Sequence, residues 1–142
     1  MSAVVRVVYR FLAALFLAGV VLEFFLAGLG VFRTQFDATA AGTTLTKTMF
    51  DHSFEPHLML GDILFGVSLL LLVAALLARI GRRGVLTALG LLVLLALQAT
   101  FAFAGPAGVR ALHPVLALLV LGTAASITFR AFRGEPGRQT PA

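Results

Sequence analysis

Cysteine and tryptophan are both missing from this chain, and only 12% of its 142 residues are charged. The lack of cysteine excludes disulfide bridges, thiolate metal sites, iron–sulfur clusters and covalently attached c-type heme. Soluble globular domains carry about a quarter of their residues as charges, so the low charge is not that of a soluble protein. Any bound metal must therefore rest on nitrogen or oxygen, and the medium that suits this composition is lipid.

Four apolar stretches with almost no charge predict four membrane-spanning helices, at about residues 11–32, 57–78, 85–104 and 112–132. A spanning helix needs about 20 residues to cross a hydrocarbon core of about 30 Å. The fourth stretch is short, and it reaches residue 132 because Arg130 can extend to the interface. Short connections make neighbouring helices antiparallel. The sequence thus predicts an all-α, integral membrane, up-down-up-down four-helix bundle that forms one transmembrane domain over residues 1–142.

The basic residues are divided unequally between the two sides of this bundle. One side receives eight arginines, namely Arg6, Arg10, Arg79, Arg82, Arg83, Arg130, Arg133 and Arg138. The other side receives only Arg33, Lys47 and Arg110. Because basic residues are retained on the cytoplasmic side, we expect both termini to be cytoplasmic in a multi-pass protein of the cell membrane. The net charge of +5 then needs no nucleic acid as a partner.

Three segments outside the predicted spans need an interpretation. Residues 33–56 form a long outer connection with several aromatic residues, which predicts a lid on the outer mouth of the bundle and leaves a short interfacial helix open. Residues 134–142 contain proline and glycine and predict a disordered tail. A basic start over Met1–Arg10 also permits a signal peptide. The apolar run that follows is longer than a signal peptide needs and is interrupted by Glu23, so a retained helix is favoured.

The sequence contains two similar units, and each includes one histidine that is a candidate functional residue. Aligning residues 21–30 with residues 96–105 places Glu23 over Gln98 and gives both segments the pattern polar-x3-Ala-x2-Gly. Downstream, each half has a histidine, His57 or His113, which starts an apolar segment and is followed by small residues on one helical face. The chain therefore reads as two helix pairs that each present one imidazole, at similar depth, beside a smooth surface.

Two imidazoles at one level predict bis-histidine ligation of a b-type heme, with His57 and His113 as metal ligands. Gly61 and Ala117, each one turn beyond its histidine, would leave room for a flat macrocycle. Arg33 and Arg110 would pair with its propionates near the water boundary.

The polar residues inside the span are expected to support this site. Glu23 and Gln98 are predicted to face the interior, as proton-linked groups around the cofactor or as hydrogen-bonding groups that hold helices together. Asp62 is expected either to hydrate from the mouth or to hold an imidazole N–H.

A zinc or copper site is the nearest chemical alternative. It would combine His52, His57 and His113 with Asp51 or Glu55 at the mouth of the bundle. A bare metal ion needs no flat clearance, so the small residues beyond His57 and His113 argue against it. His52 has no counterpart in the second repeat and is read as an ordinary loop residue. Ser–His–Asp catalysis lacks a serine in a nucleophile-like turn, and whether the chain is an enzyme stays open.

The histidine motifs resemble known membrane families. Gln98 through Gly105 and Leu112–Val115 are similar to one four-helix half of heme A synthase, and so is the first helix pair, which ends at His57. That resemblance implies that His57 and His113 are an axial pair on heme. It covers one half of the synthase, so a two-site hydroxylating enzyme would require two copies. The whole chain also resembles a family of small bacterial four-helix membrane proteins of unknown function, on His57–Gly61 and Leu112–Val115.

These features together predict a b-type heme protein of the bacterial inner membrane that works in electron transfer or heme handling. Its partners would be the lipid bilayer and a membrane redox protein or larger complex, and self-association stays open. Two other classes compete with this one. The chain could be a non-catalytic structural subunit whose small residues pack helices, or a small proton-linked carrier that uses Glu23 and Asp62.

Overall fold

The computed structural model describes residues 3–42, 44–104 and 106–133. In these ranges the chain forms helices α1 (Ala3–Ala40), α2 (Lys47–Leu77), α3 (Arg82–Phe103), α4 (Ala107–Arg110) and α5 (His113–Arg133), and no strand. Four helical stretches there are long and apolar enough to cross a membrane, with α4 and α5 taken as one stretch. The predicted all-α class is confirmed, and the chain has the helices of a multi-pass membrane protein.

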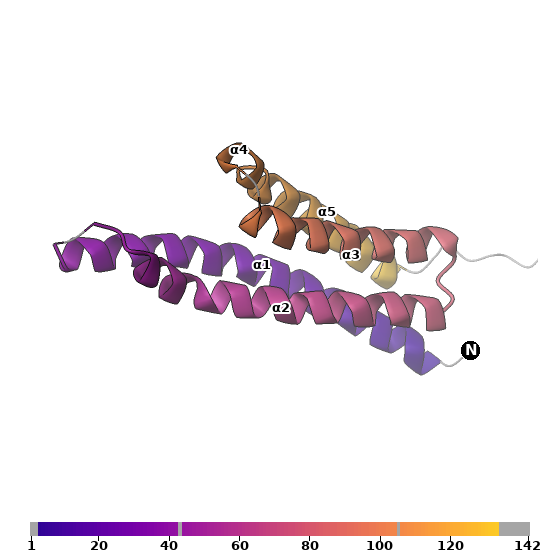
Figure 1. The fold of residues 1–142 in the computed structure, drawn as a ribbon. Coiled ribbons are helices and arrows are strands. Elements are labelled where there is room, and N and C mark those ends of the chain that lie inside the picture. Colours follow the sequence, from indigo (N-terminus) through magenta and orange to yellow (C-terminus); the bar gives the residue numbers. More distant parts are fainter. Residues whose placement is uncertain (1–2, 43, 105, 134–142) are drawn as a thin grey trace, which may run out of the picture.

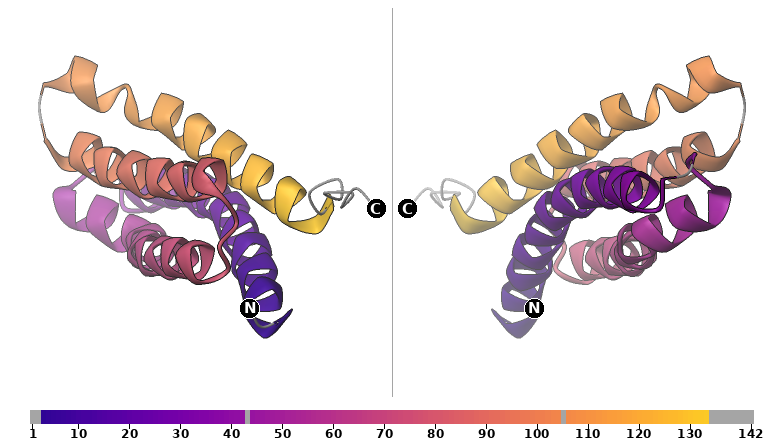
Figure 2. Two further views of the ribbon diagram at one scale, coloured as in Figure 1. Left: turned by 90° about the vertical axis from the view of Figure 1, so that its right-hand side faces the viewer. Right: turned by 90° about the vertical axis from the view of Figure 1, so that its left-hand side faces the viewer.

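The helices form two packed pairs. Helices α1 and α2 lie side by side as a long hairpin, and α3 and α5 lie against this hairpin (Figure 1). The N-terminal ends of α1 and α3 lie at the same end of the molecule as the C-terminal ends of α2 and α5. Viewed from that end, α5 crosses α3 at an angle and spreads away from it (Figure 2). The short helix α4 closes the opposite end of the α3–α5 pair.

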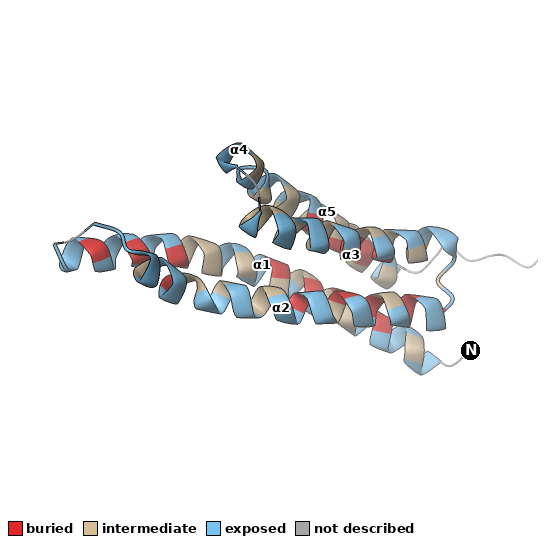
Figure 3. Ribbon diagram, viewed as in Figure 1, coloured by how far each residue is buried: buried red, intermediate tan, exposed pale blue. Residues whose placement is uncertain are grey.

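The core is a narrow strip where the helices touch (Figure 3). Its centre combines the fully buried Phe16, Leu71 and Leu91 with small residues such as Ala13 and Ala75. Small residues bring helix backbones close, which favours association inside lipid. Most large apolar side chains point outward instead, and many of them are more than half exposed. A surface of this kind suits a hydrocarbon environment rather than water.

The prediction of an outer loop over residues 33–56 is wrong. Helix α1 continues to Ala40 and α2 already begins at Lys47, so only residues 41–46 connect them. The cause is local: no proline or glycine interrupts residues 31–41, whereas Gly42 takes a φ of +61°, at which the chain leaves α1 and the turn begins. Thr46 then caps α2, since its Oγ1 accepts a hydrogen bond from the Met49 amide at 3.3 Å.

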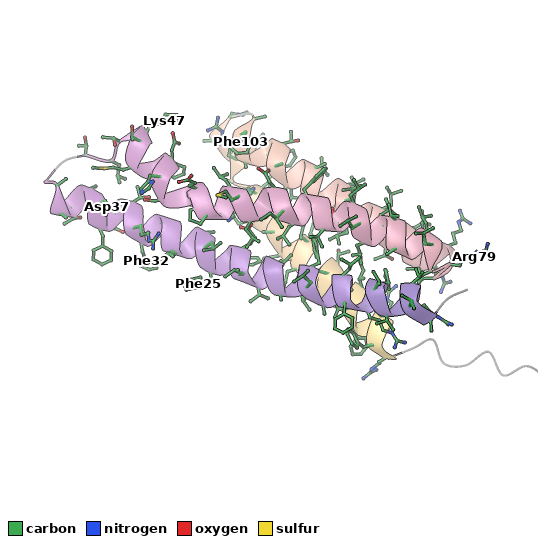
Figure 4. All side chains as sticks on the ribbon, turned by 90° about the horizontal axis from the view of Figure 1, so that it is seen from below. Phe25, Phe32, Asp37, Lys47, Arg79 and Phe103 are labelled. Carbon is green, nitrogen blue, oxygen red and sulfur yellow. The ribbon has the colours of Figure 1, made fainter. Side chains whose placement is uncertain are left out.

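This extension changes the place of the first histidine. His57 does not open its helix, because α2 starts ten residues earlier and carries Pro56 inside it. Proline removes one backbone donor and commonly kinks a helix, and the first turns of α2 lean away from the rest of the helix in Figure 4. His113, in contrast, is the first residue of α5, as expected. The predicted tail 134–142 and Gly105 lie outside the described residues.

Candidate functional site

His57 on α2 is held by an acid from α1. Its Nδ1 forms an ion pair with Glu23 Oε2, and the two side chains are only 22% and 13% exposed. The two atoms are close but are not aligned as a hydrogen bond, so the contact is chiefly electrostatic. Gly61, one turn beyond His57, faces the same acid, because a Cβ there would lie 3.6 Å from Glu23 Oε1. Burial away from water strengthens this pairing and fixes the imidazole beside α1.

His113 on α5 is held by α3. Its Nδ1 lies 3.1 Å from the backbone oxygen of Gln98, and its Nε2 lies 3.3 Å from the Gln98 amide nitrogen. A carbonyl oxygen only accepts, so Nδ1 carries the proton and Nε2 presents its lone pair to the amide. This is the tautomer that a histidine needs in order to bind a metal through Nε2.

The two imidazoles face each other at the centre of the site. Their ring centroids are 6.4 Å apart, with an interplanar angle of 82°. Each of the four long helices contributes one member of the row Glu23, His57, His113 and Gln98. The structure therefore brings the two predicted ligand histidines together, and each contacts the polar residue of its own repeat.

Three buried oxygens of this row, and His57 Nδ1, have no hydrogen-bond partner in the described part of the chain. The oxygens are Glu23 Oε1, Glu23 Oε2 and Gln98 Oε1. A buried polar atom without a partner costs about 1–3 kcal/mol. Native proteins rarely leave such atoms unsatisfied, so the cluster is arranged to receive a further group or ordered water.

An aromatic residue that the sequence analysis did not single out closes one side of the site. Phe54 packs its ring edge-on against His57 with centroids 6.2 Å apart, and it stacks on Phe50 at 4.3 Å. Gly30 of α1 makes this possible, because a Cβ there would lie 3.0 Å from the Phe54 ring. Phe54 and His57 are three residues apart, which places them on one face of a helix. This spacing could have predicted their contact from the sequence.

The remaining predicted site residues are farther from the histidine pair or are exposed. Ala117 is half-buried one turn beyond His113, whereas Asp62 is exposed, and the carboxylate that His57 meets is Glu23. Asp62 therefore does not hold the His57 imidazole. Arg33 is exposed on α1, and Arg110 is exposed on α4, where its Nη2 donates to the Phe103 carbonyl at 3.4 Å.

The alternative zinc or copper site does not form. The His52 side chain is 82% exposed and its Nδ1 lies 3.7 Å from Glu55 Oε2, while Asp51 pairs with Lys47. Within the described ranges, no group of three or more His, Asp or Glu side chains is placed to hold a metal ion. The two nitrogen-bearing rings that lie together are therefore those of His57 and His113.

Fold and site together define a helical membrane protein with a half-buried imidazole pair at the contact of its two helix pairs. The chain belongs to a family of unknown function, DUF6220, whose model matches residues 23–107. This agrees with the resemblance to a membrane protein family of unknown function. The matched segment contains Glu23, His57 and Gln98 and ends before His113. No curated protein and no solved structure matches the chain.

Proposed function

We propose that this chain is a membrane b-type heme-binding protein with His57 and His113 as the two axial ligands. The observation that carries the proposal is the imidazole pair, with ring centroids 6.4 Å apart. An imidazole nitrogen binds a first-row metal at about 2 Å, so two rings on opposite sides of one ion have centroids roughly 6 Å apart. The resemblance of the two histidine motifs to one half of heme A synthase supports the same assignment.

The surroundings of the two Nδ1 atoms support this donor set. The Nδ1 of His113 donates to the Gln98 carbonyl, and the Nδ1 of His57 lies beside Glu23 Oε2 without a hydrogen bond. Such acceptors orient a ligand histidine and raise its basicity. In this structure the Gln98 amide lies on Nε2 of His113. Ligation would require that amide to turn away from Nε2, and its Oε1 has no hydrogen-bond partner among the described residues to keep it in place.

Other residues would hold the macrocycle and exclude water. Gly61 and Ala117 keep side-chain volume small beside the two histidines, and Phe54 covers His57. Arg33 and Arg110 supply cations for the propionates. A bis-imidazole heme carries one electron at a time and leaves the iron no open position. The function we infer is therefore electron transfer with a membrane redox partner, or heme handling, in the cell membrane.

The test is heme content. Protein purified from a heme-replete host should be red, with a low-spin b-type spectrum in the reduced state and about one heme per chain. Protein that is colourless, and stays colourless after hemin is added, would remove the proposal. The structural-subunit and proton-linked carrier alternatives would then lead, and the half-buried polar row from Glu23 to Gln98 favours the carrier.

The orientation in the bilayer is part of the proposal. The arginines of the shared helix end, including Arg6, Arg82 and Arg133, favour a cytoplasmic location for that end and for both termini. Single cysteines in this cysteine-free chain can be tested with an impermeant thiol reagent on intact cells. We expect Ala41→Cys to be labelled and Arg82→Cys to be protected, and the reverse pattern would invert the topology.

A further inference from the structure

An apolar groove runs along the outside of the α3–α5 pair, away from the histidines. Its floor and walls come from Leu86, Gly90 and Val93 of α3, with Thr123 contributed by α5. The groove is strongly apolar and wide open, and residues of both α3 and α5 line it. It faces the lipid rather than the bundle interior, so its natural occupant is a long apolar chain.

Both helices lead from this groove to an arginine. Arg83 lies seven residues before Gly90 on α3, and Arg130 lies seven residues after Thr123 on α5. Seven residues are nearly two turns, or about 10 Å of rise, and return to the same helical face. Because α3 and α5 run in opposite directions (Figure 1), Arg83 and Arg130 both lie toward the same end of this helix pair.

The conformation of Arg130 is the second observation. Its Nη2 donates to Ser126 Oγ at 2.9 Å, which turns the guanidinium back by one helical turn along α5, the direction in which Thr123 lies. An arginine at a membrane boundary usually extends toward water instead. Residues 82–133 also contain no aspartate or glutamate. Neither helix can therefore neutralise Arg83 or Arg130, and the positive end of the groove calls for an anion from outside the pair.

We propose that this groove binds an anionic phospholipid. One acyl chain lies over Gly90 and between Leu86 and Val93. The phosphate lies at the end of the groove, where Arg83 and Arg130 donate charge-assisted hydrogen bonds to its oxygens. Basic pockets between membrane helices bind anionic headgroups in this way. The inference is independent of heme, since none of these residues contacts the histidine site.

The test measures lipid retention by native mass spectrometry on the full chain released from nanodiscs that contain phosphatidylglycerol and phosphatidylcholine. We expect selective retention of about one phosphatidylglycerol per chain. Arg83→Gln and Arg130→Gln should each weaken retention about fivefold, the effect of removing one interfacial cation. Arg6→Gln is the matched control, because Arg6 is an exposed arginine of α1 outside the groove. An equal loss with Arg6→Gln would mean diffuse attraction to charge and would overturn the site.

The acyl part of the proposal is tested by glycine substitutions. A Cβ at Gly90 meets nothing within 4 Å, and the same holds for Gly66 on α2, so both positions accept a larger side chain without a clash. Gly90→Leu should fill the groove and lower phosphatidylglycerol retention as much as loss of an arginine, while Gly66→Leu should leave retention unchanged. Unchanged retention in Gly90→Leu would overturn the proposal. A dimer that Gly90→Leu converts to monomer would do so as well, since the occupant would then be a second copy of the chain.

Discussion

His57→Ala and His113→Ala should each abolish the low-spin b-type spectrum, and each should lose most of the bound heme. The two imidazoles lie on α2 and α5 with ring centroids 6.4 Å apart, and under the proposed ligation each would hold the same iron. Removing either leaves one axial position without a protein nitrogen. The measurement is the heme-to-protein ratio and the reduced absorption spectrum of each purified variant.

His52→Ala is the control for this prediction. His52 lies on the same helix as His57, but its side chain is 82% exposed and pairs with Glu55 outside the site. The variant should keep wild-type heme content and spectrum. A low-spin spectrum that survives in His113→Ala and is lost in His52→Ala would place the ligands at the outer end of α2 and refute the assignment.

Glu23→Ala should weaken hemin binding about 10–100-fold, the usual cost of removing the group that orients a ligand histidine. Among the described residues, the Glu23 carboxyl is the group that lies beside His57 Nδ1, and both groups are largely buried. Alanine would leave this nitrogen without a nearby oxygen. Glu23→Gln keeps a neutral oxygen acceptor at this position and should lose much less. Hemin titration of protein depleted of heme measures the effect.

Gln98→Ala is the matched comparison, because Gln98 occupies the equivalent position in the second repeat. His113 Nδ1 uses the backbone oxygen of Gln98, which a side-chain substitution does not remove. The substitution also takes away the amide that lies on Nε2. Hemin affinity should therefore be unchanged or increased. If Gln98→Ala weakened binding as strongly as Glu23→Ala, our account of how the histidines are oriented would be wrong.

The hydrophobic pattern predicts the number of helices, but it does not predict where they end. Apolar runs report which residues suit lipid, while a helix ends only where backbone geometry or capping ends it. Residues 33–56 show the difference, because polar residues follow the apolar run and yet α1 continues to Ala40. Gly42 and Thr46 were the informative signals for the turn.

The position of this turn explains which part of the site could be predicted. Glu23 and Gly61 each lie 19 residues from Gly42, and Gly30 and Phe54 each lie 12 residues from it. Antiparallel helices advance by the same rise per residue, so residues equidistant from the turn meet. With the turn left undefined, the repeat predicted the histidine pair but not that Glu23, rather than Asp62, would hold His57.

The kind of acceptor that each histidine meets could not be predicted from the sequence either. The repeat assigns Gln98 a place equivalent to Glu23, and both do contact a histidine. Their chemistry differs, however, since a carboxylate meets one Nδ1 and a backbone carbonyl meets the other. Sequence patterns identify residue types, whereas the choice between a side-chain and a backbone acceptor depends on the packing of α3 against α5.

The central claim is that His57 and His113 share one iron, and pulsed electron paramagnetic resonance of the ferric protein tests it most directly. Protein labelled with ¹⁵N-histidine and loaded with one hemin per chain should give a low-spin signal with hyperfine coupling to two imidazole nitrogens. His113→Ala should leave coupling to at most one. A high-spin signal, or coupling to a single imidazole in the wild-type protein, would contradict bis-histidine ligation.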